Sequence, residues 1–273
     1  MKYKAFHDGQ PVPVLGLGTA HYGASSERRS EVSTLRAALD MGYAHIDTAE
    51  AYGGGGSEIV IGEAIQGYDR SKLFLTSKVR GSHLRGEQVM EAIEGSLRRL
   101  DTEYLDLYLI HHPDPKVPLE ETFEALNQLV EQGKVRYIGI SNFDSDQMDK
   151  AYGLTKSILA TNQVHYNLLV REPEDNGVLQ YCQEHDVLLT AYSPLKNGVL
   201  QQQGVRRIAD KHGASPAQIA LAWLIAKDKV ITIPQSHNVE HMRDNLGALD
   251  ITLSAEDTSS LDGLATGAMQ VGR

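Results

Sequence analysis

Four ionisable side chains of different chemical types lie at or just after the ends of short apolar segments. Asp47 and Tyr52 lie in "HIDTAEAYGG" (residues 45–54), Lys78 follows "LFLTS", and His111 ends "LDLYLIH". A tyrosine hydroxyl in water has a pKa of about 10, and a neighbouring ammonium lowers that value because it stabilises the phenolate. Lys78 can be this neighbour, and Asp47 can supply the counter-charge that a desolvated lysine needs.

The same four side chains indicate one kind of chemistry. A neutral imidazole at His111 can donate a hydrogen bond to a carbonyl oxygen and orient it, while Tyr52 delivers a proton to that oxygen. Such a site stabilises the negative charge that develops on the oxygen when a hydride adds to the carbonyl carbon. Since no side chain can donate a hydride, a nicotinamide cofactor is expected.

Further residues at predicted strand ends could hold that cofactor. Tyr192 offers a flat ring on which a nicotinamide can stack, and its carboxamide can be held by Ser141, Asn142 and Gln163. The segment "IPQSHNVEHMRDN" (233–245) follows the last predicted strand and opens a helix. At this position barrel enzymes commonly bind phosphate through backbone N–H groups and the helix dipole.

Strand-like and helix-like segments alternate along the whole chain. Apolar residues recur at helical spacing in several segments, for example at Val89, Ile93, Leu97 and Leu100. Ser215 precedes a proline and an apolar run, which indicates a helix start. Strands that alternate with helices favour right-handed crossovers and a parallel sheet. The predicted strands are residues 14–19, 44–49, 73–79, 105–111, 135–141, 160–167, 187–193 and 230–236.

Eight predicted strands in 273 residues favour an α/β fold, a (β/α)8 TIM barrel formed by a single domain over residues 1–273. Such barrels typically need about 250 residues, and their active sites lie where the strands end. The alternative is a doubly wound sheet, whose dinucleotide-binding form carries Gly-x-Gly-x-x-Gly after its first strand. Gly16, Gly18 and Gly23 miss this spacing. Before the first barrel strand, "HDGQ" reads as a turn between two short strands.

Composition limits the classes of partner and compartment. The formal net charge of -10 and pI near 5.5 argue against general binding to nucleic acid or to anionic membranes. The single cysteine, Cys182, cannot form an internal disulfide, and no apolar run reaches the roughly 20 residues that span a bilayer. The N-terminus lacks the features of a secretory signal. A cytoplasmic protein is expected, and its oligomeric state cannot be read from the sequence.

The sequence resembles the aldo-keto reductase family. The resemblance is carried, in order, by "VPVLGLGT", "GYAHIDTAEAYG", "GEAI", "LFLTSKV", "SLRRLDTEYLDLYLIHHPD", "GKVRYIGISNF", "NQVHYN", "AYSPL" and "VITIPQS". It implies a (β/α)8 barrel closed at its bottom by an N-terminal β-hairpin, and NAD(P)H-dependent reduction of aldehydes and ketones. It also implies that the catalytic residues are Asp47, Tyr52, Lys78 and His111. The cofactor positions it implies are Thr19, Asp47, Ser141, Asn142, Gln163, Tyr192, Ser193, Leu195, Ile233, Gln235, Ser236, His237, Asn238, His241, Asp244 and Asn245.

Two departures from the family pattern concern the choice of cofactor. Gln235 stands where many members have a lysine that faces the 2'-phosphate of NADPH, and His241 stands where many have an arginine. An amide cannot neutralise a phosphate, although Arg243 could compensate and a histidine can carry partial charge. We therefore expect NADP as the cofactor, with NAD also possible and weak discrimination between the two.

Other departures concern the substrate. Ala20 and His112 stand where well-known members have tryptophan, so the substrate pocket formed with Tyr52 and His111 is expected to be less aromatic and more polar. The segment "TGAMQVGR" (266–273) is all that remains to form the C-terminal loop that often covers the substrate in this family. Small aldehydes are expected, including dicarbonyls such as methylglyoxal or sugar-derived aldehydes.

Several motifs have simpler interpretations. No metal site is expected at His111 and His112, because adjacent strand residues point to opposite sides. Glu50 is expected to face solvent, and "GGGG" (53–56) to let the chain turn into a helix near residue 57 rather than bind phosphate. Cys182 and Trp223 lie in predicted helices and are expected to be packing residues. His165, which replaces a common glutamate, has no assigned role.

Two other classes of function compete with catalysis of carbonyl reduction. Members of the family also serve as cofactor-sensing regulatory subunits, and a barrel of this kind would show little turnover. A phosphate-sugar isomerase or lyase on the same fold would need no nicotinamide.

Overall fold

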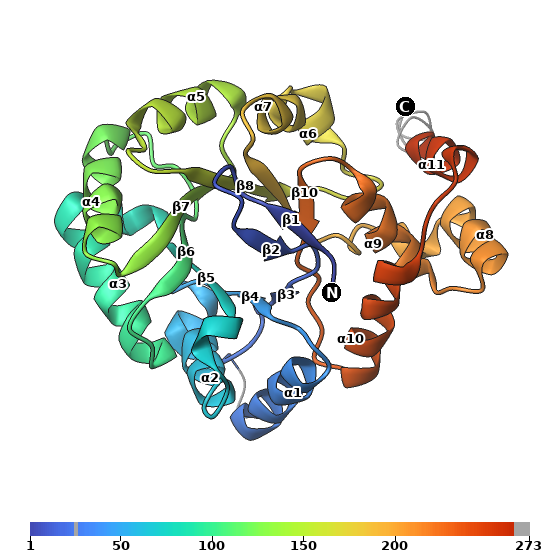
Figure 1. The fold of residues 1–273 in the computed structure, drawn as a ribbon, viewed down its shortest axis with the longest axis horizontal. Helices are drawn as coiled ribbons and strands as arrows, with labels where there is room; N and C mark the ends of the chain where they lie inside the picture. The colour runs from blue at the N-terminus through green and yellow to red at the C-terminus, as the bar shows by residue number, and fades with distance from the viewer. Residues whose placement is uncertain (25–26, 265–273) are drawn as a thin grey trace.

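Eight parallel strands curl around one axis and are surrounded by helices (Figure 1). The computed structural model describes residues 1–24 and 27–264. Neighbouring strands follow the order β10-β9-β8-β7-β6-β5-β4-β3, which is the sequence order that successive right-handed crossovers produce. The strands are β3 (Leu17–Gly18), β4 (His45–Asp47), β5 (Phe74–Val79), β6 (Leu105–Ile110), β7 (Val135–Ser141), β8 (Leu159–His165), β9 (Leu188–Tyr192) and β10 (Val230–Thr232).

The first and last strands meet, which closes the barrel. The backbone N–H of Thr232 donates to the carbonyl of Val14 at 2.9 Å, and Gly16 donates back to Thr232 at 2.9 Å. One step further along, Gly18 donates to the carbonyl of Pro234 at 3.1 Å. The predicted TIM barrel is therefore confirmed. Most strands are shorter than predicted, and β3, β4 and β10 have only two or three residues. Only isolated bonds of the kind above join the rest of the predicted segments 14–19 and 230–236.

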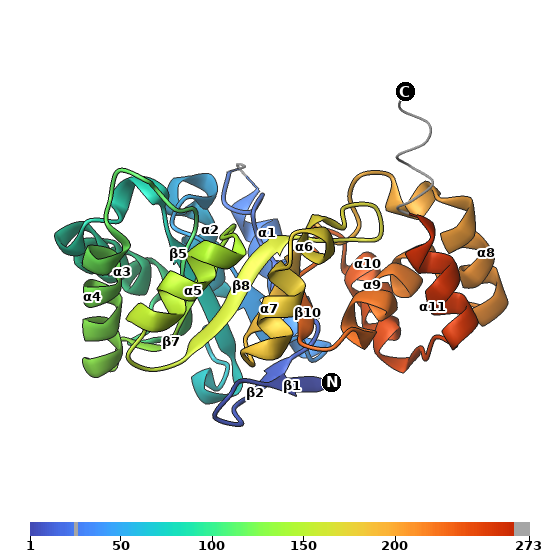
Figure 2. The same cartoon turned by 90° about the horizontal axis from the view of Figure 1, so that it is seen from above.

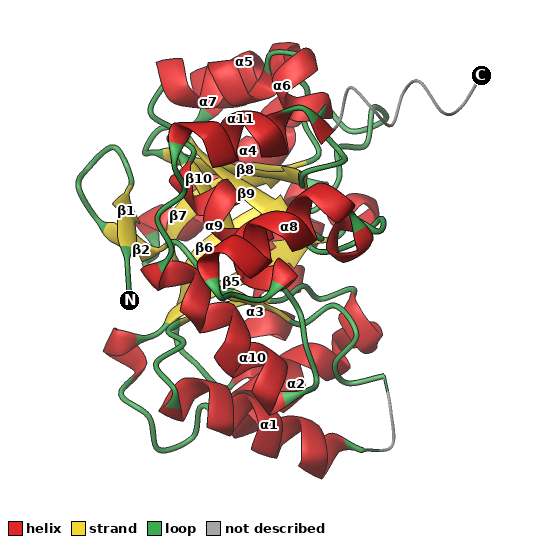
Figure 3. Ribbon diagram, turned by 90° about the vertical axis from the view of Figure 1, so that its right-hand side faces the viewer, coloured by secondary structure: helices red, strands yellow, loops and turns green. Residues whose placement is uncertain are grey.

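Helices surround the strands and cover their outer faces (Figure 3). Figures 1 and 2 show that α8 and α11 lie outside the main ring, beyond α9. The α-helices are α1 (Arg28–Asp40), α2 (Gly56–Ala64), α3 (Gly86–Leu100), α4 (Leu119–Glu131), α5 (Ser145–Leu154), α6 (Glu172–Asp175), α7 (Val178–Glu184), α8 (Gln203–His212), α9 (Pro216–Ala226), α10 (Val239–Leu246) and α11 (Ala255–Asp262). Short 3-10 turns are η1 (Tyr52–Gly55), η2 (Arg70–Lys72), η3 (Gly81–His83), η4 (Val199–Gln201) and η5 (Gly247–Asp250).

The sequence signals for helices are confirmed where they were strongest. Ser215 caps α9: its hydroxyl accepts from the N–H of Gln218, whose side chain accepts from the N–H of Ser215. The apolar face predicted in α3 is buried against the barrel. Cys182 in α7 and Trp223 in α9 are buried as expected. No helix within residues 1–24 and 27–264 is long and apolar enough to cross a membrane.

An N-terminal β-hairpin lies across the end of the barrel opposite the strand C-termini (Figure 2). Its strands β1 (Tyr3–Ala5) and β2 (Pro11–Pro13) are antiparallel, and Gly9 in the turn has φ of 87°. The ammonium of Lys4 donates to the carbonyls of Ile225 and Val230 at 3.0 and 2.6 Å. The predicted closure of the bottom by a hairpin is thus confirmed, and the opposite end is left open for chemistry.

Candidate active site

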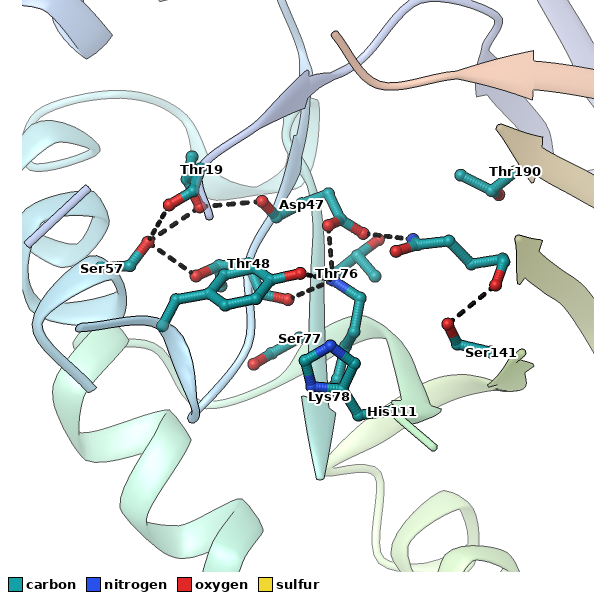
Figure 4. Close-up of polar contacts among 12 residues, drawn as sticks. Thr19, Asp47, Thr48, Ser57, Thr76, Ser77, Lys78, His111, Ser141 and Thr190 are labelled. Carbon is teal, nitrogen blue, oxygen red and sulfur yellow. Dashed lines mark hydrogen bonds and ion pairs between the residues drawn. The ribbon is translucent and has the colours of Figure 1, made fainter. Parts of the chain in front are cut away.

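The site is built on two neighbouring strands, β4 and β5. Asp47 ends β4 and Lys78 lies near the end of β5, and both side chains point into the barrel where they are buried. The Lys78 ammonium lies 2.5 Å from Asp47 Oδ1 and 2.7 Å from the carbonyl oxygen of Thr48 (Figure 4). Burial alone would lower the pKa of Lys78, but Asp47 and Tyr52 outweigh it and raise that pKa. The ammonium therefore stays protonated inside the barrel.

Tyr52 reaches this ion pair from the loop that follows β4. Its hydroxyl lies 3.4 Å from the Lys78 ammonium, which also lies 5.0 Å from the centre of the tyrosine ring. Immediately after Tyr52, Gly53 and Gly54 have φ of 58° and 63°, in the left-handed region that glycine tolerates. These residues let the chain turn directly into α2, as predicted for the glycine run.

His111 faces Tyr52 from the end of β6. The two rings meet edge to face, with centroids 5.5 Å apart and an interplanar angle of 84°. Burial, together with the positive charge of Lys78, lowers the pKa of His111 to about 3. The imidazole is therefore neutral at physiological pH and can donate one N–H to a substrate oxygen. The four residues predicted to be catalytic thus lie together.

A chain of buried hydroxyls supports the loop that carries Tyr52. The Thr19 hydroxyl donates to the carbonyl of Asp47 at 2.9 Å, and the Ser57 hydroxyl donates to that of Thr19 at 2.8 Å (Figure 4). The hydroxyls of Ser57 and Thr48 are 2.9 Å apart. Sequence reasoning missed Ser57 and Thr48, because a single hydroxyl residue at the start of a helix or after a strand is common in any sequence.

Predicted cofactor residues form a second network beside the catalytic ones. The Gln163 side chain donates to Asp47 Oδ2 at 2.7 Å, and the Ser141 hydroxyl donates to the carbonyl of Gln163 at 2.8 Å. Asn142 accepts at 3.0 Å from the hydroxyl of Tyr192. Asn142 also has φ of 62°, an uncommon backbone conformation for a residue other than glycine that is often found at functional sites. These contacts fix the Gln163 amide beside Asp47 and the Asn142 amide beside the hydroxyl of Tyr192.

A cavity of about 300 Å³, called here the mouth cavity, opens at this end of the barrel. Asp47 and Tyr52 line the cavity and Lys78 does not. Lys78 would therefore act on a ligand there indirectly, through its contacts with these two residues. The predicted residues that line the mouth cavity are Thr19, Ala20, Asp47, Tyr52, His111, His112, Ser141, Asn142, Gln163, Tyr192, Ser193, Leu195, Ile233 and Gln235.

A second cavity of about 270 Å³, the side cavity, adjoins the first. Leu195 and Gln235 line both, so the two cavities can accommodate one extended ligand. The mouth cavity offers a flat aromatic ring and hydrogen-bonding amides, and the side cavity offers polar groups. This combination fits a dinucleotide. The predicted cofactor residues that line the side cavity are Leu195, Gln235, Ser236, His241, Asp244 and Asn245.

Two predicted cofactor residues line neither cavity. His237 stacks on Tyr22, with centroids 4.2 Å apart and an interplanar angle of 13°. The Asn238 side chain caps α10, where it accepts from the N–H groups of Glu240 and His241 at 2.8 and 3.3 Å. Those two N–H groups therefore already have a partner, so the helix end is less available to phosphate than its position in the sequence indicated.

Arg243 does not line the side cavity, so it adds no positive charge to that lining. Its exposed guanidinium pairs with Glu240 at 2.5 Å on the same helix. The side cavity is lined by His241 and the acidic Asp244, whose carboxylate accepts from the Ser215 hydroxyl at 2.5 Å.

The expectation that Glu50 faces solvent is wrong. Its side chain is buried and accepts from the backbone N–H of Arg80 at 2.8 Å, and it lies 3.1 Å from His83 Nδ1. A carboxylate can be buried when such donors replace water. Glu50 thus ties the loop that carries Tyr52 to the segment just after Lys78.

Two histidines also differ from expectation. The rings of His111 and His112 are stacked, with centroids 4.7 Å apart, rather than pointing to opposite sides. Strand β6 ends at Ile110, so the alternation of a strand no longer applies to them. His165 pairs with Tyr192 across β8 and β9, and its ring stacks on that of Tyr192 at 5.4 Å.

Among residues 1–24 and 27–264, no group of three or more histidine, cysteine, aspartate or glutamate residues could hold a metal ion. The segment 266–273, expected to form a loop over the substrate, lies outside the described residues.

Comparisons with known proteins agree with this geometry. The model of the family described as Aldo/keto reductase family matches residues 14–266. The chain is 41% identical over 259 residues to methylglyoxal reductase YeaE of Escherichia coli strain K12, covering 92% of this chain and 90% of that protein.

Solved structures show the same fold at similar identity. The thermostable aldo-keto reductase Tm1743, solved with the inhibitor epalrestat, has a TM-score of 0.92 and 44% identity, covering 97% of this chain and 100% of that one. An aldo-keto reductase from Klebsiella pneumoniae, solved with NADPH, has a TM-score of 0.89 and 41% identity, covering 97% and 96%. With a family match over most of its length and a barrel of this architecture, the chain belongs to the aldo/keto reductase family and is an oxidoreductase.

Proposed function

We propose that this aldo-keto reductase reduces small aldehydes and ketones to alcohols with NADPH, including dicarbonyls such as methylglyoxal and sugar-derived aldehydes. One observation carries the proposal: the Lys78 ammonium lies within hydrogen-bond distance of both the Asp47 carboxylate and the Tyr52 hydroxyl. Similarity to a methylglyoxal reductase and to a reductase solved with NADPH supports the substrate class and the cofactor.

In the proposed mechanism, Tyr52 is the general acid. Its hydroxyl proton passes to the carbonyl oxygen of the substrate, and the Lys78 ammonium stabilises the phenolate that remains. Asp47 holds the ammonium in place, and neutral His111 donates a hydrogen bond to the same oxygen as negative charge develops on it. A bound nicotinamide would supply the hydride for the carbonyl carbon.

The cofactor is proposed to extend from the mouth cavity into the side cavity. Tyr192 would stack on the nicotinamide, and Ser141, Asn142 and Gln163 would hold its carboxamide. Among residues 1–24 and 27–264, no lysine or arginine lines the side cavity, and His241 contributes its one imidazole. Because an additional phosphate would find little positive charge there, we propose that NADH can replace NADPH with only a modest loss.

The test is a panel of small aldehydes, ketones and dicarbonyls assayed with NADPH and NADH in parallel. Turnover of several panel members, with a less than roughly hundredfold difference in kcat/KM between the cofactors, is expected. Preference for NADPH by several hundredfold would contradict the cofactor proposal. Negligible turnover with normal NADPH affinity would favour a cofactor-sensing regulatory role, and a failure to bind either cofactor would favour an isomerase or lyase.

We further propose a single domain over residues 1–273 that works in the cytoplasm on small molecules, without nucleic acid or membrane partners. The net charge of -10 and the buried, unpaired Cys182 support this placement. Fractionation of cells that produce the protein would test it.

A further inference from the structure

His112 lies beside the catalytic groups and has no part in the mechanism above. It follows His111 directly, is exposed and lines the mouth cavity. The two imidazoles are stacked with an interplanar angle of 19° and centroids 4.7 Å apart. A ligand that contacts His111 in this cavity therefore lies next to His112 as well.

The contacts of Asn142 favour one position for the proton of His112. The side-chain nitrogen of Asn142 lies 3.1 Å from the backbone carbonyl oxygen of His111, which can only accept a hydrogen bond. This contact identifies that atom as the amide nitrogen, and the other amide atom accepts from Tyr192 at 3.0 Å. The same nitrogen lies 2.9 Å from Oγ of Ser141 and 3.1 Å from Nδ1 of His112, so its two hydrogens are shared among three atoms. Since two donors would repel, Nδ1 accepts and the proton of the neutral ring is on Nε2.

Both stacked rings are neutral. Burial and the positive charge of Lys78 lower the pKa of His112, as they do for His111. Each ring therefore has one N–H to donate. In the mechanism above, the N–H of His111 is used by the oxygen of the reacting carbonyl, which leaves the Nε2–H of His112 without a role.

We propose that His112 Nε2–H donates to a second oxygen, on the carbon next to the reacting carbonyl, so that the site selects 2-oxoaldehydes over simple aldehydes. This inference rests on the proposed function. Tyr52 and His111 bind the first oxygen, and His112 binds the second. A simple aldehyde has no second acceptor, so it leaves this donor to water and loses one hydrogen bond.

The test compares two substrates that differ in one oxygen, methylglyoxal and propanal. The quantity measured is the ratio of their kcat/KM values in the full-length enzyme with NADPH. His112→Asn keeps an acceptor near the position of Nδ1, where Asn142 can donate to it, but it removes the donor that faces the substrate. His112→Gln places an amide N–H near the position of Nε2 and so keeps that donor.

We expect His112→Asn to lower the methylglyoxal-to-propanal ratio about threefold to tenfold, the contribution of one hydrogen bond. His112→Gln should keep the ratio within about twofold of the wild-type value. The two aldehydes are hydrated to different extents in water, but this difference is the same for every variant. It therefore does not affect the comparison of the ratios between variants. An unchanged ratio in His112→Asn, or equal losses in both variants, would overturn the proposal.

Two controls separate this proposal from more general effects. His185→Asn makes the same substitution at the end of α7, where the ring stacks on Tyr181, and should leave the ratio unchanged. The Kd for NADPH, measured by fluorescence titration, shows whether the cofactor site stays intact in each His112 variant. Should the wild-type enzyme reduce neither aldehyde, the proposed function itself fails; turnover of both with the His112→Asn ratio unchanged overturns only the role of His112.

Discussion

The ammonium of Lys78 lies 3.4 Å from the hydroxyl of Tyr52, although the two residues are 26 positions apart in the chain. This contact joins the end of β5 to the loop after β4. It gives the proposed proton donor a positive neighbour that is itself held by Asp47 at 2.5 Å. The first two predictions concern this arrangement.

Tyr52→Phe should lower kcat for methylglyoxal by roughly 10²-fold to 10⁴-fold, because it removes the proton donor and leaves the ring in place. The Kd for NADPH should stay close to the wild-type value, since no cofactor hydrogen bond is assigned to this hydroxyl. Steady-state kinetics and fluorescence titration measure the two quantities. Turnover within tenfold of the wild-type rate would show that another group supplies the proton.

Lys78→Met should abolish turnover and also destabilise the fold. Lys78 is fully buried, and its loss leaves the Asp47 carboxylate with the Gln163 amide as its side-chain partner. Removing one member of a buried ion pair typically costs about 3–5 kcal/mol in the free energy of unfolding. Urea denaturation measures this cost. Adding Asp47→Asn to Lys78→Met should recover part of the stability but none of the activity, whereas equal instability would argue against an uncompensated charge.

Gln235→Lys combined with His241→Arg should increase the preference for NADPH over NADH. Both residues line the side cavity, so two cations there would attract an additional phosphate. We expect the ratio of the two KM values to change by at least about tenfold at low salt and to fall as salt screens the charges. The matched control, Gln235→Met with His241→Gln, adds no charge. A similar shift in the control would rule out charge as the cause.

The stability of the fold should fall as the pH drops from about 6.5 to 4 because of His45. This side chain is buried inside the barrel, and burial lowers its pKa from 6.5 to about 4, although Asp47 partly opposes the change. Between these values the unfolded chain binds a proton that the folded protein does not, so acid favours unfolding. The shift corresponds to about 3 kcal/mol lost across this range.

His45→Gln is the variant that isolates this effect. Its amide can replace the contact of His45 Nε2 with the Thr76 hydroxyl, 3.1 Å away, and it does not titrate. Urea midpoints at pH 7 and pH 4.5 should therefore differ less in the variant than in the wild-type protein. Equal pH dependence in both would assign the acid sensitivity to other groups.

Much of this protein could be predicted from local sequence patterns. The positions of all eight barrel strands, the capped start of α9 and the hairpin turn at "HDGQ" depend on neighbouring residues, whose spacing and conformational preferences act over a few positions. Asp47, Lys78 and His111 could be placed at one site because parallel strands in a barrel end at the same mouth.

Tertiary packing decided the rest. The residues next to Glu50 in the chain predict only a loop position for it. Arg80 and His83 approach from another segment and supply the donors that allow its carboxylate to be buried. His111 and His112 stack because β6 ends one residue earlier than predicted. The sequence alone determined which chemical groups end the strands. Their partners, burial and proton positions arise from contacts between distant segments, which no local pattern records.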